Sequence, residues 1–227
     1  FARAIQDADE VLPVFVFDPR WFAERPLLGI KKTGIFRASF LIEAVADLRQ
    51  SLRNHGGDLV IRIGDPAVIL GDLARELVVD AVYASKEVTQ EETDIESTLS
   101  KRLKPLNIDI ELFWMATLYH VRDLPFGIFK LPDVFTTFRK SLEEKVPIRP
   151  TVKTPDRVRL VEHIEPGELP SLQTFGFTEP VPVDNRAAMA FKGGETAALA
   201  RLHEYLWEHD QLQHYKETRN GLLGPNY

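Results

Sequence analysis

Three glutamates stand directly behind a predicted strand. Glu87, Glu91 and Glu92 follow the apolar run Ala81-Val-Tyr-Ala. A carboxylate at the carboxyl end of a parallel strand lies where open α/β sheets bind their ligands. It can accept two hydrogen bonds from a ring amidine such as a pterin or guanine edge. The same glutamates open a predicted helix, where acidic side chains offset the helix dipole. Taken alone, the residues favour this second, solvated role.

A second group with chemical potential lies near the end of the chain. It combines an aromatic ring, two cations and an amide: Tyr215, Lys216, Arg219 and Asn220. Residues 215 and 219 are one helical turn apart, so they share a helix face. Such a set can bind a phosphate or stack on a ring, although aromatic residues near helix ends more often pack against their own protein.

Several other kinds of chemistry lack support in the sequence. The chain has no cysteine, which excludes disulfides and thiol catalysis and fits a reducing compartment. Neither a Gly-rich pyrophosphate fingerprint nor a phosphate-loop motif occurs, and no nucleophile elbow is present. We interpret Gly56-Gly57 and Gly193-Gly194 as turns or helix boundaries rather than phosphate cradles. No metal site is predicted, because three histidines fit one helix face poorly: His203, His209 and His214.

Charge and hydropathy narrow the possible partners. A net charge of −6 argues against nucleic-acid binding over the whole surface but leaves room for a local basic groove. No apolar run approaches the ~18 residues of a membrane span, so no membrane partner is expected.

The candidate residues need a sheet and helices to position them. Helices are predicted between the strands, at 36–52, 66–77 and 89–103, with Val68, Ile69, Leu73 and Leu77 of the second facing inward. Short apolar or alternating runs predict four strands: 11–17, 59–63, 81–84 and 108–114. This order predicts an α/β fold with a Rossmann-like, doubly wound parallel sheet.

The amino-acid composition and periodicity change twice along the chain. We predict an α/β domain over 1–117, a proline-rich connector over 118–190 with a helix at 134–145, and the first helices of an all-α domain over 191–227. The opening residues resemble the last turns of a helix, so we expect the first strand of the sheet to be missing.

Several stretches together resemble the photolyase/cryptochrome family, and most closely its DASH-type cryptochromes. The resemblance covers essentially the whole chain. It rests on these segments: Leu12-Pro-Val-Phe-Val-Phe-Asp-Pro-Arg, Lys32-Thr-Gly, Phe40-Leu-Ile-Glu-Ala-Val-Ala-Asp-Leu-Arg, Lys86-Glu-Val-Thr-Gln-Glu-Glu, Thr117-Leu-Tyr-His-Val-Arg-Asp-Leu-Pro-Phe, Leu131-Pro-Asp-Val-Phe-Thr, Gly193-Gly-Glu-Thr-Ala-Ala-Leu and Tyr215-Lys-Glu-Thr-Arg-Asn-Gly-Leu-Leu-Gly.

The resemblance implies an antenna domain followed by a helical FAD-binding domain. It implies that Glu87 and Glu92 bind an antenna folate, 5,10-methenyltetrahydrofolate, and that Tyr215 contacts FAD. Arg219, assisted by Lys216, is implied as a contact to DNA phosphate. No residue of the chain is expected to be catalytic. The family's first strand, its flavin phosphate loop and its electron-transfer tryptophans have no counterpart in the sequence.

The resemblance therefore implies part of a blue-light-absorbing flavoprotein. Its parent resembles a deoxyribodipyrimidine photolyase, a lyase that repairs pyrimidine dimers, chiefly in single-stranded or looped DNA, by light-driven electron transfer from FAD. We expect a monomer, and we expect the chain alone to lack repair activity and to bind FAD weakly. Two alternatives remain: a blue-light receptor or transcriptional regulator without repair, and an unrelated doubly wound nucleotide-binding domain such as an electron-transfer flavoprotein subunit.

Overall fold

The computed structural model describes residues 1–157, 161, 163–182, 189 and 191–221. Parts of the predicted connector (158–160, 162, 183–188 and 190) and the last six residues of the predicted helical domain (222–227) lie outside the described residues. The chain divides into two compact units, Phe1–Asp7 with Pro66–Pro155 and Ala8–Asp65 with Asp156–Tyr227.

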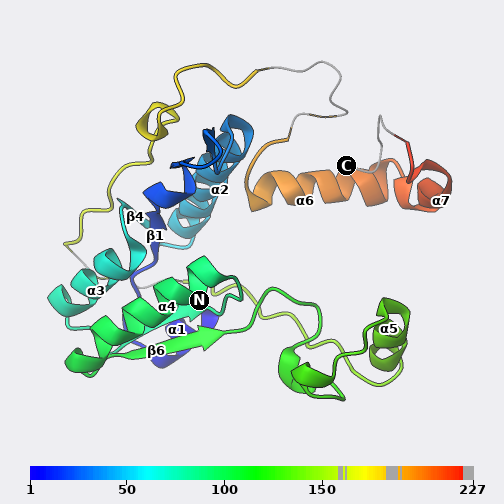
Figure 1. The fold of residues 1–227 in the computed structure, drawn as a ribbon, viewed down its shortest axis with the longest axis horizontal. Helices are drawn as coiled ribbons and strands as arrows, with labels where there is room; N and C mark the ends of the chain where they lie inside the picture. The colour runs from blue at the N-terminus through cyan, green and yellow to red at the C-terminus, as the bar shows by residue number, and fades with distance from the viewer. Residues whose placement is uncertain (158–160, 162, 183–188, 190, 222–227) are drawn as a thin grey trace. The chain divides into compact units, whose positions relative to one another are not determined.

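The first unit contains a parallel strand pair and the helices around it (Figure 1). β5 pairs with β6 in parallel, with Ala81 opposite Asp109 and Ser85 opposite Phe113. The regular elements of the first unit are α1 (Ala2–Asp7), α3 (Pro66–Glu76), β5 (Ala81–Ser85), α4 (Gln90–Leu103), the 3₁₀ turn η2 (Lys104–Leu106), β6 (Asp109–Phe113), the 3₁₀ turns η3 (Val121–Asp123) and η4 (Ile128–Lys130), and α5 (Phe135–Glu143).

Small residues let α3 approach α4. The core of this unit gathers five buried residues: Ala67, Ala74, Leu99, Leu103 and Ile108. Gly71 is also buried, and a Cβ built on it would lie 3.4 Å from the side chain of Arg102 on α4. The prediction that Val68 faces inward is wrong, since its side chain is 41% exposed. The face that packs is the one with the smallest side chains, because those permit the closest helix contact.

The second unit contains the other parallel pair. β1 pairs with β4, with Val14 opposite Val60 and Phe17 opposite Ile63. Its regular elements are β1 (Val14–Phe17), the 3₁₀ turn η1 (Pro19–Trp21), the short antiparallel pair β2 (Glu24–Arg25) and β3 (Ile30–Lys31), α2 (Ile35–Asn54), β4 (Val60–Ile63), the 3₁₀ turn η5 (Gln173–Phe175), α6 (Glu195–His203), the π-helical segment η6 (Glu204–Glu208), the 3₁₀ turn η7 (Gln211–His214) and α7 (Tyr215–Thr218).

α2 ends as the glycine pair predicts. The Gly57 N–H donates to the Leu52 carbonyl at 2.9 Å and the Gly56 N–H donates to the Arg53 carbonyl at 3.0 Å. Gly56 has a φ of +79°. This is the Schellman arrangement, in which the residue after the cap is left-handed and is therefore most often glycine.

Part of the connector belongs to the core of the second unit. Phe175 of η5 stacks on Phe22 with ring centroids 3.7 Å apart, and the Phe17 centroid lies 5.7 Å from that of Phe175. Lys31 fixes the end of the same turn, because its Nζ donates to the Phe175 and Gly176 carbonyls at 2.8 Å each. Phe175 is thus a buried member of the core of this unit.

The structure confirms the α/β class and the parallel strand pairing. Each compact unit holds one of the parallel pairs, β1–β4 or β5–β6. Within the predicted helical region 191–227, α6 ends at His203 and continues as the π-helical segment η6, and the 3₁₀ turn η7 begins at Gln211. The domain boundaries at 117 and 190 stay a prediction.

Candidate ligand site at the carboxyl end of β5

The chain leaves β5 at the carboxyl edge of the β5–β6 pair. Ser85 is the last paired residue, and the Lys86 N–H then donates to the Phe113 carbonyl at 2.8 Å. Glu87 is the next residue and is exposed. The structure therefore places Glu87 in the loop where a parallel sheet presents groups to a ligand.

α4 begins three residues beyond Glu87. Thr89 is the N-cap residue with extended backbone, and the Thr93 N–H donates to the Thr89 carbonyl at 3.0 Å. Glu91 and Glu92 lie in the first turn, where the helix dipole favours negative charge. Glu92 is half-buried whereas Glu91 is exposed. The two carboxylates that the resemblance singles out thus lie on separate elements, one in the loop and one on the helix.

A third glutamate joins that loop to the helix. Glu96 on α4 accepts a hydrogen bond from the Glu87 N–H through Oε1 at 2.8 Å, and its Oε2 pairs with the Lys86 ammonium. The sequence analysis did not single out Glu96. Its spacing could have revealed it, since residues 92 and 96 lie one helical turn apart and share a face.

The second candidate group begins on α7 (Figure 1) and continues just past its end, with Arg219 as the C-cap residue. The Arg219 N–H donates to the Tyr215 carbonyl at 2.8 Å, which confirms that these residues are one turn apart. Tyr215, Lys216, Arg219 and Asn220 are all exposed. The side chains of Lys216 and Arg219 are therefore accessible to an anion, and the Tyr215 ring is accessible to a planar group.

Gly193-Gly194 marks a helix boundary, as the sequence predicts. Gly194 is the N-cap of α6, and the Gly193 N–H donates to Glu43 Oε2 at 2.8 Å. Asp47 Oδ2 accepts from the Thr196 N–H at 3.0 Å. Carboxylates of α2 therefore occupy N–H groups that a phosphate would need.

The described residues contain neither a candidate membrane span nor a candidate metal cluster. None of their helices is both long and apolar enough to cross a membrane. Within the same residues, no group of three or more His, Asp or Glu side chains could hold a metal ion.

The first unit is an α/β domain with exposed carboxylates beyond the carboxyl end of β5, the edge at which open α/β sheets generally bind ligands. The family model for DNA photolyase matches residues 1–156. Since this match covers more than half of the chain, the chain belongs to the DNA photolyase family.

The similarity reaches beyond the matched region to DASH-type cryptochromes. A cryptochrome DASH of Gloeobacter violaceus is 46% identical over 224 residues, which is 99% of this chain and 44% of that protein. The cryptochrome DASH of Xenopus laevis is 42% identical over 99% of this chain and 43% of its own length. The chain thus spans less than half the length of these curated relatives.

Solved structures of a cryptochrome and a photolyase also superpose on this chain. The crystal structure of a Synechocystis cryptochrome superposes with a TM-score of 0.91 at 39% identity, covering 98% of this chain and 46% of that one. An archaeal photolyase from Sulfolobus tokodaii, solved with two FAD molecules, superposes with a TM-score of 0.68 at 22% identity over 87% of this chain and 41% of that one. This second match supports the fold alone.

Proposed function

We propose that this chain is the antenna part of a DASH-type cryptochrome whose complete protein repairs pyrimidine dimers in DNA with light. The observation that carries the proposal is the similarity over 99% of the chain to cryptochrome DASH proteins. FAD would supply the electron for repair. The residues of this chain bind and orient chromophores and DNA rather than make or break bonds.

The antenna chromophore in this proposal is 5,10-methenyltetrahydrofolate, held by Glu87 and Glu92. The pterin ring of a folate presents an amidine edge, and a carboxylate matches that edge with two parallel hydrogen bonds. Glu87 is exposed at the carboxyl end of β5 and Glu92 is half-buried in the first turn of α4. These two carboxylates can therefore accept the hydrogen bonds that the pterin edge donates.

Tyr215 is the proposed flavin contact, and Arg219 with Lys216 the proposed DNA contacts. All three side chains are exposed on or beside α7. A guanidinium binds phosphate through two parallel N–H donors, whereas an ammonium acts as a point charge. Arg219 is therefore the stronger candidate for a positioned phosphate, with Lys216 adding attraction.

A repair assay tests the proposed function. The full-length protein, purified with its flavin, is mixed with single-stranded or duplex DNA that carries one pyrimidine dimer, then illuminated or kept dark. We expect repair in the light only, with single-stranded DNA repaired faster. Absence of repair on both substrates from a flavin-loaded, photoreduced sample would contradict the enzymatic proposal.

That negative result would favour the second candidate, a blue-light receptor without repair. The naming of the similar proteins as cryptochromes supports this candidate. It predicts a light-dependent change in conformation or in binding to a partner, measured by limited proteolysis of lit and dark samples.

The antenna site has its own test. Replacing Glu87 or Glu92 by Ala in the full-length protein removes a carboxylate that would accept from the pterin, so we expect folate content to fall about tenfold. Flavin content should not change. The folate-to-flavin ratio of the purified proteins measures this, and an unchanged ratio in both variants would refute the assignment.

A further inference from the structure

The loop that carries Glu87 is tied down from two sides. On one side the Lys86 N–H donates to the carbonyl of Phe113 at the end of β6. On the other side Glu96 reaches from the second turn of α4 and accepts from the Glu87 N–H at 2.8 Å. The backbone at residues 86 and 87 is therefore fixed to both a strand and a helix.

Glu96 uses both of its carboxylate oxygens for this purpose. Oε1 accepts from the Glu87 N–H, and Oε2 pairs with Lys86 Nζ. The Glu96 side chain is 15% exposed, compared with 37% for that of Lys86. A hydrogen bond to a charged acceptor that is largely shielded from water is stronger than one between neutral, exposed groups. Both oxygens are engaged, so Glu96 is poorly placed to bind a ligand itself.

We propose that Glu96 is a positioning residue that sets the loop from which Glu87 meets the antenna chromophore. The inference rests on the proposed folate role of Glu87. Two parallel hydrogen bonds to a ring edge require a carboxylate in a defined place and orientation. A loop free to move would lose affinity, because binding would then have to order it.

Substitutions at Glu96 and Lys86 distinguish the two bonds that Glu96 makes, one to the Glu87 N–H and one to the Lys86 ammonium. Glu96→Ala removes both, whereas Glu96→Gln keeps an oxygen that can accept from the Glu87 N–H and loses the ion pair. The exchange Lys86→Glu with Glu96→Lys restores opposite charges but leaves no acceptor for that N–H. Asp94→Asn is the matched control, because Asp94 is an exposed carboxylate on the same helix that accepts only from the nearby Gln90 among the bonds described.

The experiment titrates 5,10-methenyltetrahydrofolate into full-length, flavin-containing protein stripped of folate, with Glu87→Ala as reference. We expect Glu96→Ala and the charge exchange to raise the dissociation constant about tenfold, and Glu96→Gln to raise it about threefold. Asp94→Asn should match the wild type. Flavin content should stay constant in all variants, which a general loss of the fold would not allow.

The outcomes distinguish the folate-binding role of Glu87 from the positioning role of Glu96. If Glu87→Ala weakens binding and Glu96→Ala does not, the positioning role is refuted and the antenna site stands. Full rescue by the charge exchange would also refute it, because the acceptor for the Glu87 N–H would then be unnecessary. A wild-type protein that binds no folate would refute the antenna role and, with it, this inference.

Discussion

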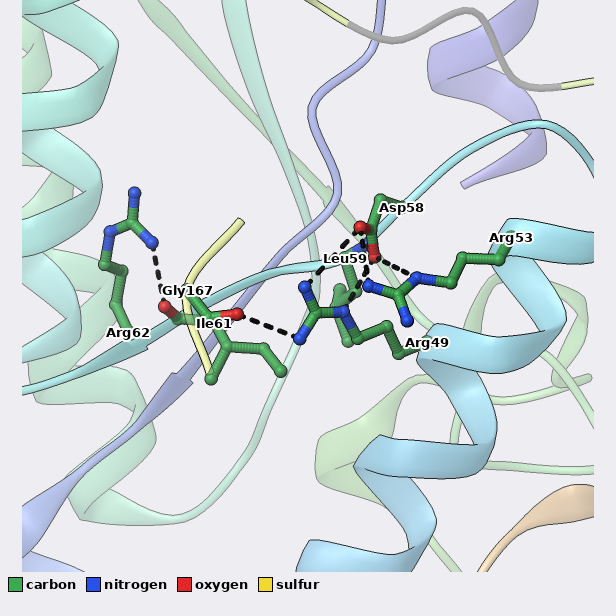
Figure 2. A network of polar contacts seen from close by, with 7 residues as sticks. All are labelled: Arg49, Arg53, Asp58, Leu59, Ile61, Arg62 and Gly167. Carbon is green, nitrogen blue, oxygen red and sulfur yellow. Dashed lines mark hydrogen bonds and ion pairs between the residues drawn. The ribbon is translucent and has the colours of Figure 1, made fainter. Parts of the chain in front are cut away.

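Asp58 connects three segments of the second unit (Figure 2). It lies between α2 and β4 and accepts from Arg49 Nε at 2.8 Å, from Arg53 Nη2 at 3.0 Å and from the Leu59 N–H at 2.7 Å. Arg49 extends the network by donating to the Gly167 carbonyl at 2.9 Å. A carboxylate and a guanidinium thereby join the helix, the strand and the connector.

This network makes stability depend on pH. Burial raises the pKa of Asp58, but hydrogen bonds from Arg49 and Arg53 and from the Leu59 N–H outweigh it and lower the pKa from 3.8 to about 2. A carboxyl with a depressed pKa in the folded state stabilises the fold above its unfolded pKa, here by about 2 kcal/mol. That contribution is lost as the pH falls from about 4 through 2.

Asp58→Asn should remove this dependence. We expect the full-length variant to be about 2 kcal/mol less stable at pH 7 and to lose less stability between pH 4 and 2 than the wild type does. Urea unfolding at several pH values measures both quantities. Asp72→Asn is the control, because its partner Arg75 lies on the same helix and the pair is exposed, and such pairs contribute little. Equal acid sensitivity in wild type and Asp58→Asn would contradict the prediction.

Arg49 shows what the sequence could not reveal at the residue scale. In the sequence it separates apolar positions and looks like a solvated residue, yet it is 8% exposed while Phe36, in the same helix, is 59% exposed. The partners that permit its burial are Asp58 and Gly167, and the second lies 118 positions away. Periodicity within a helix carries no information about such distant partners.

At the scale of elements, α2 holds the start of α6. Glu43 and Asp47 lie one turn apart on α2 and accept from the Gly193 and Thr196 N–H groups. The backbone hydrogen bond from Thr196 is the main cause that lowers the pKa of Asp47. Carboxylates of one helix therefore satisfy the open N–H groups of another, which the first turn of a helix cannot satisfy by itself.

The contact requires glycine at position 193. A Cβ there would lie 2.2 Å from the Phe40 carbonyl oxygen and 2.9 Å from the Ala44 nitrogen. We expect Gly193→Ala to destabilise the full-length protein by about 1–3 kcal/mol, since backbone atoms must move to admit the methyl group. Chemical denaturation measures the loss.

Gly127→Ala provides the comparison for that prediction. A Cβ at residue 127 meets nothing within 4 Å, and its φ of −70° suits any residue. This variant should match the wild type or exceed it slightly, because alanine reduces the freedom of the unfolded chain. Equal effects of the two substitutions would show that the close approach at Gly193 is not what limits stability.

At the scale of the whole molecule, the sequence predicted the order of elements well. The four predicted strands, observed as β1, β4, β5 and β6, and the α2, α3 and α4 helices begin or end within a few residues of their predicted positions, because apolar period and turn residues are local signals. The short pair β2 and β3 was not predicted. The helix faces that pack against the core were predicted less well. α3 packs through Ala67, Gly71 and Ala74, and a pattern that ranks residues by hydrophobicity overlooks such small side chains.

The candidate site was likewise predicted only in part from the sequence. Position predicts Glu87, Glu91 and Glu92 together, because a loop after a parallel strand and the first turn of the next helix meet at the sheet edge. The choice of Glu87 and Glu92 among them, and of a folate as their ligand, follows from the family resemblance. The spacing of Glu96 from Glu92 places both on one helix face, but the bond of Glu96 to the Glu87 N–H, nine residues away, follows only from the folded chain.

The connector also determines whether an edge of β4 is open to another polypeptide. One edge of β4 pairs with β1, and an unpaired edge elsewhere would invite another polypeptide to add a strand. Here the Ile61 N–H donates to the Pro166 carbonyl at 2.7 Å, and Arg62 Nη2 donates to the Glu165 carbonyl at 2.9 Å. Gly167 follows so closely that a Cβ would lie 2.4 Å from the Ile61 oxygen (Figure 2). Residues 165–167 thus cover part of this edge of β4, and we expect a chain that lacks them to expose the edge to pairing with another polypeptide.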